Sequence, residues 1–136
     1  MRDSKSGEQV SSRGFISLKD RIQKDAKGSL GVILILSIIK MEKKTWGYQI
    51  KKTLGNLTVG KFQIKDSSLY TILNNLEKKY RLIQSTKERK LRFYSLTELG
   101  FEELERVQNY WQELVVIGNE AFENMKSLQS PVILER

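Results

Sequence analysis

The chemistry that this sequence can offer is concentrated between residues 66 and 92, where hydroxyl, amide and cationic side chains follow one another closely. Asparagine can form two hydrogen bonds with the edge of an adenine, serine and threonine adapt to several bases, and lysine and arginine neutralise phosphates. The side chains that we expect to contact DNA are Ser67, Ser68, Tyr70, Thr71, Asn74, Asn75, Lys78, Lys79, Lys87, Arg89, Lys90 and Arg92. A solvated helix face followed by a solvated turn would have a similar composition, so the rest of the sequence must decide between the two interpretations.

The composition excludes most other kinds of site. The 136 residues include no histidine and no cysteine, so the usual general base, the usual zinc ligands and thiol nucleophiles are all missing. We therefore expect no catalytic constellation, no metal centre and no cofactor, and we do not expect an enzyme. The longest apolar run, residues 30–39, is about half of the roughly 20 residues that a membrane span needs. Because the first residues do not resemble a signal peptide either, a cytoplasmic protein is expected.

The formal net charge of +8 is unevenly distributed along the chain. Residues 1–28 carry a net charge of +3, residues 29–96 carry +10 and residues 97–136 carry −5. A strongly basic segment suits a polyanion, because each neutralised phosphate releases condensed counterions. The acidic last segment indicates a second, different task.

The elements that would position the polar side chains begin with helices. Residues 1–14 are rich in serine, glycine and charge, and we expect them to form a disordered arm. A short helix over 15–26 is predicted to start with Ser17 as its N-cap. Gly28 is expected to interrupt it, and a second, almost entirely apolar helix over 29–41, starting with a serine cap, would lie in the centre of the core.

A third helix is predicted over residues 45–54, opened by Thr45 as a cap. Its two aromatic residues, Trp46 and Tyr48, are expected to be core or half-buried anchors rather than DNA readers. The residues from 57 to 64 are expected to be extended.

A fourth helix is predicted over residues 66–80, with Asp66 or Ser67 as its cap. Apolar side chains recur in it at helical spacing, which places one face in the core. These core positions are Leu69, Ile72, Leu73, Leu76 and Tyr80. The opposite face carries the hydroxyl and amide groups introduced above.

Two strands are predicted next, over residues 82–86 and 91–96, joined by a charged hairpin tip at 87–90. Three helices followed by a hairpin with a cationic tip is the element order of a winged helix-turn-helix. The predicted fold is therefore mostly α with a small β-wing, with a DNA-binding domain over 15–96, a recognition helix over 66–80 and a wing at 87–90.

The last predicted helix begins after a Thr97 cap and ends at about residue 129, leaving residues 130–136 as a tail. Its apolar residues follow a heptad pattern, so this helix of 97–129 is expected to pack against its own domain and against a second chain. The expected dimer interface comprises Leu104, Val107, Trp111, Leu114, Gly118, Ala121, Phe122 and Met125.

Five short motifs, in this order, resemble the PadR (phenolic-acid-responsive) family of transcriptional regulators over roughly residues 28–128. They are Leu34-Ile-Leu-Ser-Ile-Ile39, Gly47-Tyr48-Gln-Ile50, Ser68-Leu-Tyr70-Thr-Ile-Leu73 with Leu76-Glu77, Arg92-Phe-Tyr-Ser-Leu-Thr97-Glu-Leu-Gly100, and Trp111 in the terminal helix.

The resemblance implies a winged-helix homodimer, held together by its C-terminal helix, that binds an inverted-repeat operator and usually represses transcription. The single C-terminal helix places the chain with the shorter members of the family. The resemblance also implies that Tyr70 lies near the DNA backbone, where it either contacts a phosphate or simply packs. It further implies that Trp111 either packs the interface or stacks on a small flat aromatic effector.

The sequence departs from the family pattern just before the first strand. The family usually has Leu-Glu-x-x-Gly-Leu-Ile, whereas this chain has Leu76-Glu-Lys-Lys-Tyr-Arg-Leu82-Ile83, with one extra residue and no glycine. It also has Lys43-Lys-Thr-Trp46 where the family often has Gly-Pro before His-Gly-Tyr. These departures bear on how the recognition helix ends and on the angle of the wing.

Two other functions remain open at this point. An architectural protein would use the same wing and basic surface to coat duplex DNA with little sequence preference. An interaction module would use the long heptad helix to bind a different protein, with the winged helix as a scaffold.

Overall fold

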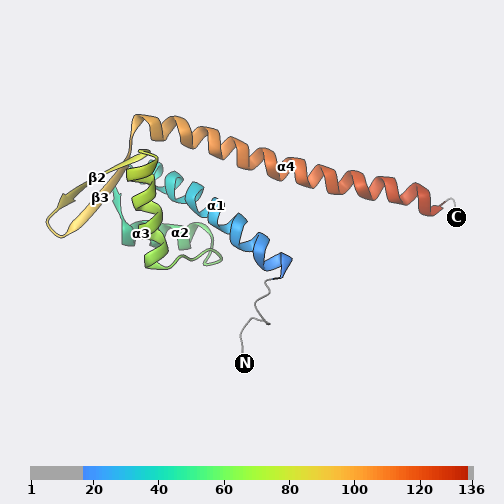
Figure 1. Ribbon diagram of the computed structural model, residues 1–136, viewed down its shortest axis with the longest axis horizontal. Helices are drawn as coiled ribbons and strands as arrows, with labels where there is room; N and C mark the ends of the chain where they lie inside the picture. Colours follow the sequence, from blue (N-terminus) through green and yellow to red (C-terminus); the bar gives the residue numbers. More distant parts are fainter. Residues whose placement is uncertain (1–16, 135–136) are drawn as a thin grey trace, which may run out of the picture. The chain divides into compact units, whose positions relative to one another are not determined.

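The computed structural model describes residues 17–134, with side chains as far as residue 129. The elements follow the order α1, β1, α2, α3, the π-helix η2, β2, β3 and α4 (Figure 1). A mostly helical fold with a small antiparallel sheet and a long C-terminal helix confirms the predicted fold class. The chain divides into two compact units, residues 1–34 and 35–136. The arm predicted over 1–14 lies outside the described residues.

Helix α1 spans Leu18–Glu42 without interruption. Ser17 is its N-cap as predicted, because its Oγ accepts a hydrogen bond of 3.1 Å from the backbone N–H of Asp20. The expected break at Gly28 is wrong, and so is the serine cap at the following residue. A single glycine weakens a helix by only about 1 kcal/mol, which the turns on either side can offset.

The next segment also differs from its prediction. Thr45 does not cap a helix: Thr45–Trp46 is the short strand β1, and α2 begins afterwards and spans Gly47–Leu57. The Thr45 side chain is completely buried and its backbone pairs with Tyr94 of the sheet. A β-branched residue is suited to this extended, buried position. The helix also continues past the predicted stop at 55–56 by one residue.

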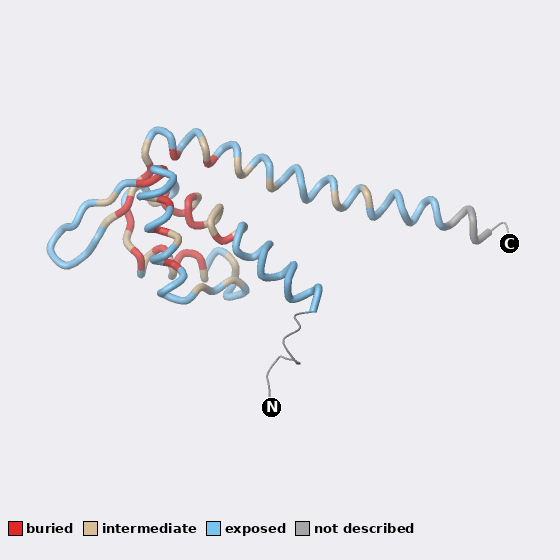
Figure 2. Tube along the Cα trace, in the orientation of Figure 1, coloured by how far each residue is buried: buried red, intermediate tan, exposed pale blue. Residues whose placement is uncertain are grey.

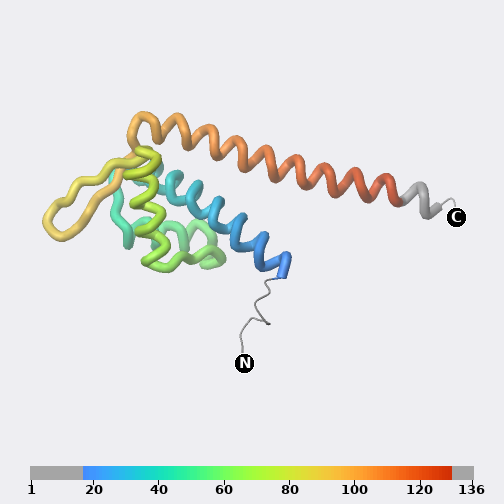
Figure 3. The backbone as a smooth tube through the Cα atoms, viewed as in Figure 1, coloured from blue at the N-terminus to red at the C-terminus, as the bar shows by residue number. Residues whose placement is uncertain are grey.

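Helix α3 spans Asp66–Asn74 and continues directly into η2, Asn75–Lys79. Together they occupy the segment predicted as one helix over 66–80. Their N-cap is Lys65, which makes no side-chain capping hydrogen bond, so neither Asp66 nor the following serine is the cap. Residues 57–64 were expected to be extended, but residue 57 ends α2, residues 58–60 form a turn, 61–62 form a bend, and 63–65 have no regular secondary structure before α3 (Figure 3).

The sheet has the strand order β1-β3-β2, with both pairs antiparallel. Strand β3 spans Leu91–Leu96 as predicted, whereas β2 spans Ile83–Glu88 and continues two residues beyond its predicted end. The hairpin turn is therefore confined to Arg89 and Lys90.

Helix α4 spans Glu98–Leu134. Thr97 is its N-cap as predicted, since its Oγ1 accepts a hydrogen bond of 3.0 Å from the N–H of Gly100. The helix continues through Pro131 and ends about five residues later than predicted. A proline removes one backbone donor, and here that loss falls within the last turns.

The hydrophobic core of the second unit is formed by one face of each element (Figure 2). Most of its large side chains come from the C-terminal half of α1, from α2 and from α3. The buried apolar residues are Ile35, Leu36, Ile38, Ile39, Ile50, Leu54, Leu69, Leu73, Leu76, Leu82, Ile83, Tyr94, Leu96 and Leu104. This core fixes which face of α3 points outward.

Candidate nucleic-acid interface

The outward face of α3 carries the side chains that could read bases. Leu69 and Leu73 are buried on one side of the helix, which turns its other side to solvent. The residues exposed on that side, continuing into η2, are Ser67, Ser68, Tyr70, Thr71, Asn74, Asn75 and Lys78. Figure 2 shows this helix largely in the colour of exposed residues, apart from its buried stripe. The predicted segregation of a core face and a polar face is therefore confirmed.

The polar groups on this face differ in how far they are already used. The Thr71 hydroxyl donates a hydrogen bond of 2.9 Å to the backbone oxygen of Ser67, one turn earlier. Within the described part of the chain, no hydrogen bond engages the side-chain amides of Asn74 and Asn75. These two amides keep their full capacity to pair with a base edge.

Tyr70 packs against the start of α2. A Cβ atom added to Gly47 would lie only 2.3 Å from the Tyr70 hydroxyl oxygen, so the tyrosine ring can lie across this backbone only because residue 47 is glycine. This contact explains why residue 47, at the start of α2, is a glycine. It also holds the phenol, which is half exposed, at the junction of two helices.

The extra residue at the end of the recognition helix is accommodated as a π-helical turn. The N–H of Tyr80 donates to the carbonyl of Asn75 at 3.0 Å, and the N–H of Leu82 donates to that of Leu76 at 2.8 Å. Between them Arg81 has φ 59°, in the left-handed region. Arginine thus adopts the conformation that glycine would adopt with least strain at the end of a helix.

The π turn also explains a wrong prediction. Tyr80 was expected in the core because it follows Leu76 at helical spacing, but 53 % of it is exposed. A π turn contains one residue more than an α turn, so residues after it are rotated away from the face that they would share in a regular helix. Lys79 lies beside this ring, with its Nζ 5.2 Å from the ring centroid.

One face of the β2–β3 hairpin points towards η2. Ser85 donates a hydrogen bond of 2.8 Å to the Glu77 carboxylate, and Arg92 donates one of 3.1 Å to the Ser85 hydroxyl oxygen. Lys87 lies directly opposite Arg92 in the strand register, and side chains two residues apart share a face. The hairpin therefore presents Lys87 and Arg92 as neighbouring positive charges on the side of the recognition helix.

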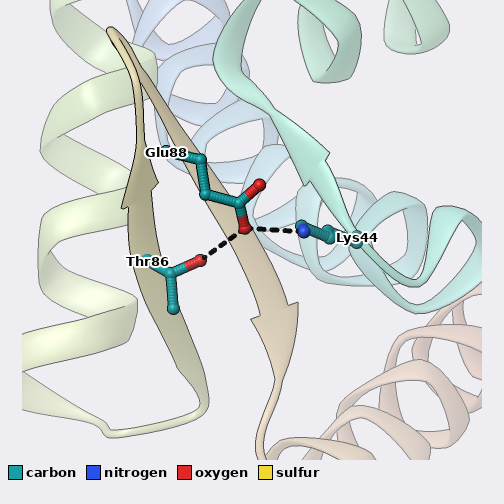
Figure 4. Close-up of polar contacts among 3 residues, drawn as sticks. All are labelled: Lys44, Thr86 and Glu88. Atoms are coloured by element: carbon teal, nitrogen blue, oxygen red, sulfur yellow. Dashed lines mark hydrogen bonds and ion pairs between the residues drawn. The ribbon is translucent and has the colours of Figure 1, made fainter.

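On the opposite face of the hairpin, Lys44 reaches across the sheet to Glu88 (Figure 4). Its Nζ lies 2.6 Å from a carboxylate oxygen of Glu88 and 5.0 Å from the ring centroid of Phe93. The same carboxylate accepts a weaker hydrogen bond of 3.4 Å from Thr86. The hydrogen bond from Lys44 is the main reason why the pKa of Glu88 lies below its ordinary value. Because Lys44, which lies outside the hairpin, neutralises Glu88, the hairpin tip keeps its positive charge.

The tip itself is a two-residue turn with backbone strain. Arg89 has φ 60°, again in the left-handed region. Lys87, Arg89, Lys90 and Arg92 are all exposed. The structure therefore places every side chain predicted to contact DNA on the surface of α3, η2 or the hairpin.

Sequence reasoning missed the contribution of α2. Tyr48 was expected to be at least half buried, but 69 % of it is exposed, whereas Trp46 is half-buried as predicted. Lys51 and Lys52 follow Tyr48 at the spacing of one helical turn. This spacing is the signal that could have identified an exposed polar face on α2.

Helix α4 presents a long apolar face to solvent. Its first turns belong to the domain core: Leu104 is only 1 % exposed, and Gln108 donates a hydrogen bond of 2.8 Å to the Ser37 hydroxyl oxygen. Val107 and Trp111 are half-buried. The large apolar residues exposed farther along are Tyr110, Leu114, Val115, Val116, Ile117, Phe122, Met125 and Leu128.

The described residues contain no group of three or more acidic side chains that could hold a metal ion. In the same part of the chain, no helix is both long and apolar enough to cross a membrane.

Helices α1 to α3 followed by a β-hairpin make this fold a winged helix-turn-helix, extended by one long C-terminal helix. Comparison with known proteins agrees. A transcriptional regulator from Clostridium thermocellum superimposes with a TM-score of 0.65 at 25% sequence identity, covering 71% of this chain and 96% of that one. A PadR family transcriptional regulator from Eggerthella lenta shares the fold, with a TM-score of 0.64 at 22% identity over 78% of this chain and 93% of its own.

The family itself follows from sequence. The model of the transcriptional regulator PadR-like family matches residues 35–106. An uncharacterized protein of Lysinibacillus sphaericus is 33% identical over 94 residues, which are 65% of this chain and 83% of that protein. The chain belongs to the PadR-like family, as the motifs predicted, and is a transcriptional regulator rather than an enzyme.

Proposed function

We propose that this regulator binds a specific DNA sequence as a homodimer, with α3 and η2 in the major groove and the hairpin tip on the backbone. The operator is an inverted repeat, and the protein acts on it in the cytoplasm as a repressor. The observation that carries the proposal is the exposure of all twelve predicted DNA-contacting side chains on one recognition helix and one hairpin.

Base reading is assigned to the recognition helix. The Asn74 and Asn75 amides are exposed and keep their hydrogen-bonding capacity, and an asparagine can pair with both N6 and N7 of an adenine. Ser67 and Ser68 lie at the start of the same helix, the end that usually enters the groove.

Phosphate binding is assigned to the hairpin. Lys87 and Arg92 are directly opposed across the strands, and like charges in such a pair weaken a sheet. A phosphate beside them would turn this repulsion into attraction. The pairing of Lys44 with Glu88 keeps the one carboxylate of β2 from opposing that phosphate.

Homodimer formation is assigned to α4, whose exposed apolar face is longer than a monomer has reason to keep. The proposed interface comprises Val107, Trp111, Leu114, Gly118, Ala121, Phe122 and Met125. Leu104 is left out because the protomer already buries it. Two-fold symmetry would then set two half-sites about one helical turn, roughly 34 Å, apart. Repression is proposed because the resemblance to the PadR family implies it.

Selection of bound duplexes from a random DNA pool, at near-physiological salt, tests the proposal. Enrichment of an inverted repeat with half-sites about one turn apart is the expected result. Enrichment of a single half-site would refute the dimeric arrangement. Strong binding without any enrichment would refute sequence-specific binding and support the architectural alternative, whose binding depends on salt but hardly on sequence.

A further inference from the structure

A hollow of about 450 Å³ lies between α2 and the beginning of α3. Its lining comprises Tyr48, Lys51, Lys52, Asp66 and Tyr70. Only Tyr70 belongs to the interface predicted from the sequence. The hollow therefore extends the proposed DNA-binding surface onto α2.

The lining is chemically suited to an anion with several oxygen acceptors. Two phenol hydroxyls and two ammonium groups can donate hydrogen bonds, and both ammonium groups carry a positive charge. Tyr48 and Tyr70 are each at least half exposed, so their hydroxyl groups are accessible. Gly47 fixes the position of the Tyr70 ring at this place, because a larger residue would collide with it.

The position of the hollow in the fold indicates which anion this is. Helix α2 is the first helix of the helix-turn-helix unit, and this helix crosses the DNA backbone when the second one lies in the major groove. A hollow shared by the first helix and the start of the second faces the backbone beside the groove. The anion is therefore a phosphate of the bound duplex.

Asp66 is the acidic residue of this lining, and it already occupies one of the cations. Its Oδ1 lies 2.7 Å from Lys51 Nζ. The Asp66 side chain is 75% exposed and that of Lys51 is 40% exposed, so the pair is accessible to an incoming phosphate.

We propose that this hollow binds one backbone phosphate of the duplex and that Asp66 competes with that phosphate for Lys51. The inference rests on the proposed function. In the free protein Lys51 is neutralised by Asp66, and DNA binding must exchange one anion for the other. The competition lowers affinity for every duplex alike, and the preference between sequences is left to the base contacts of α3.

The test is a double-mutant cycle on a 20–30 base-pair duplex carrying the selected repeat, and on a scrambled duplex, each titrated with salt. One phosphate contact contributes about 0.9 to the slope of log affinity against log salt. This corresponds to about eightfold in affinity at 0.1 M salt relative to 1 M salt. Asp66→Asn is expected to raise affinity for both duplexes, by up to about eightfold, and to steepen the slope by up to about 0.9. Lys51→Ala is expected to weaken binding to both duplexes and to flatten the slope by the remainder, so that the two changes together amount to about 0.9.

The double variant separates competition from a general effect of charge. If Asp66 acts by holding Lys51, Asp66→Asn has a clearly smaller effect once Lys51 is alanine. The same gain in both backgrounds would overturn the competition, and an unchanged slope in Lys51→Ala would overturn the phosphate contact.

A matched control removes the same charge elsewhere. Glu123 on α4, whose side chain is about as exposed as that of Asp66, forms an ion pair with Lys126 at 3.2 Å, and Glu123→Gln should leave affinity and salt slope unchanged. Failure of the inference is distinguishable from failure of the proposed function. In the first case the wild-type protein still prefers the repeat to the scrambled duplex; in the second the wild-type protein itself shows no preference.

Discussion

The substitution Arg81→Gly tests how the recognition helix ends. Residue 81 has φ 59° immediately after the π turn, and a non-glycine residue in this conformation costs roughly 1–2 kcal/mol. Glycine removes that cost but adds freedom to the unfolded chain, worth about 0.5–1 kcal/mol. The Arg81 side chain is exposed, and only its backbone oxygen is used, as the acceptor from Thr97 Oγ1 at 2.9 Å. The net expectation is a gain of about 0.5–1 kcal/mol in the free energy of unfolding.

Thermal and urea denaturation at one fixed protein concentration measure this gain, because the stability of a dimer depends on concentration. A gain of this size corresponds to a rise in Tm of about 2–5 °C for a domain of this length. Arg81→Ala serves as the matched control: it removes the same charge but keeps a Cβ atom and hence the backbone strain. Arg89→Gly is the functional comparison, since it relieves the same strain at φ 60° but removes a proposed phosphate contact.

We therefore expect both glycine variants to be more stable than the wild type, and only Arg89→Gly to bind operator DNA more weakly. If Arg81→Gly and Arg81→Ala have the same stability, the left-handed residue does not carry the cost assigned to it. If Arg89→Gly binds operator DNA as tightly as the wild type, the proposed phosphate contact of Arg89 is wrong.

Three further outcomes are expected. Asn75→Ala should cost roughly 1–3 kcal/mol on the selected operator and little on a scrambled duplex, whereas Lys90→Ala should weaken both and flatten the salt slope by about one; equal losses of the Asn75 variant on both duplexes would contradict base reading. Leu114→Asp should make the protein monomeric in analytical ultracentrifugation while the matched Gln112→Asp stays dimeric, and a dimeric Leu114→Asp would exclude the proposed interface. Because its pKa is lowered in the folded protein, Glu88 contributes stability that is present above the ordinary pKa of a glutamate and is lost as the pH falls through the lowered value; Glu88→Gln should therefore weaken the dependence of stability on pH in acid, measured by urea denaturation across that range.

The parts of the fold that follow from local sequence could be predicted. The spacing of Leu69, Leu73 and Leu76 determines which face of α3 is buried, and hence that the asparagines and serines lie outside. The Thr97 cap and strand β3 are also encoded within a few neighbouring residues. In each case the residues that carry the signal lie within one short segment, so that segment is enough to predict the feature.

The parts that depend on distant residues could not be predicted. Thr45 has the chemistry of a helix cap, but its backbone pairs with Tyr94, about fifty residues later, and that pairing places it in a strand. Gly28 was misjudged for a different, local reason, since the cost of one glycine is small enough for the helical turns on both sides of it to offset. Tyr48 was expected to be at least half buried. The spacing of Lys51 and Lys52 indicates an exposed face, but the hollow that this face borders forms only where Tyr70 packs on Gly47.

The candidate site was incomplete for the same reason. Residues 66–92 form one continuous run of suitable chemistry, whereas Tyr48, Lys51 and Lys52 join that surface only when α2 packs beside α3. A search by composition finds the run and misses the helix next to it. The pairing of Lys51 with Asp66 spans fifteen residues and is visible only in the fold.

The turn after η2 links the two tasks of the protein. The backbone of Leu82 donates to Leu76 in the recognition helix and accepts from the N–H of Thr97 at 3.0 Å, at the start of α4. Gly100 lies so close to the Leu82 carbonyl that a Cβ atom there would approach it to 2.0 Å, which leaves little room for this junction to adjust. The end of the helix proposed to read DNA and the start of the helix proposed to form the dimer are therefore fixed to the same two residues, 81 and 82. In a homodimer, the distance between the two recognition helices then depends on this junction. The π turn η2, which sets how α3 enters the junction, would thus influence the half-site spacing that the dimer accepts.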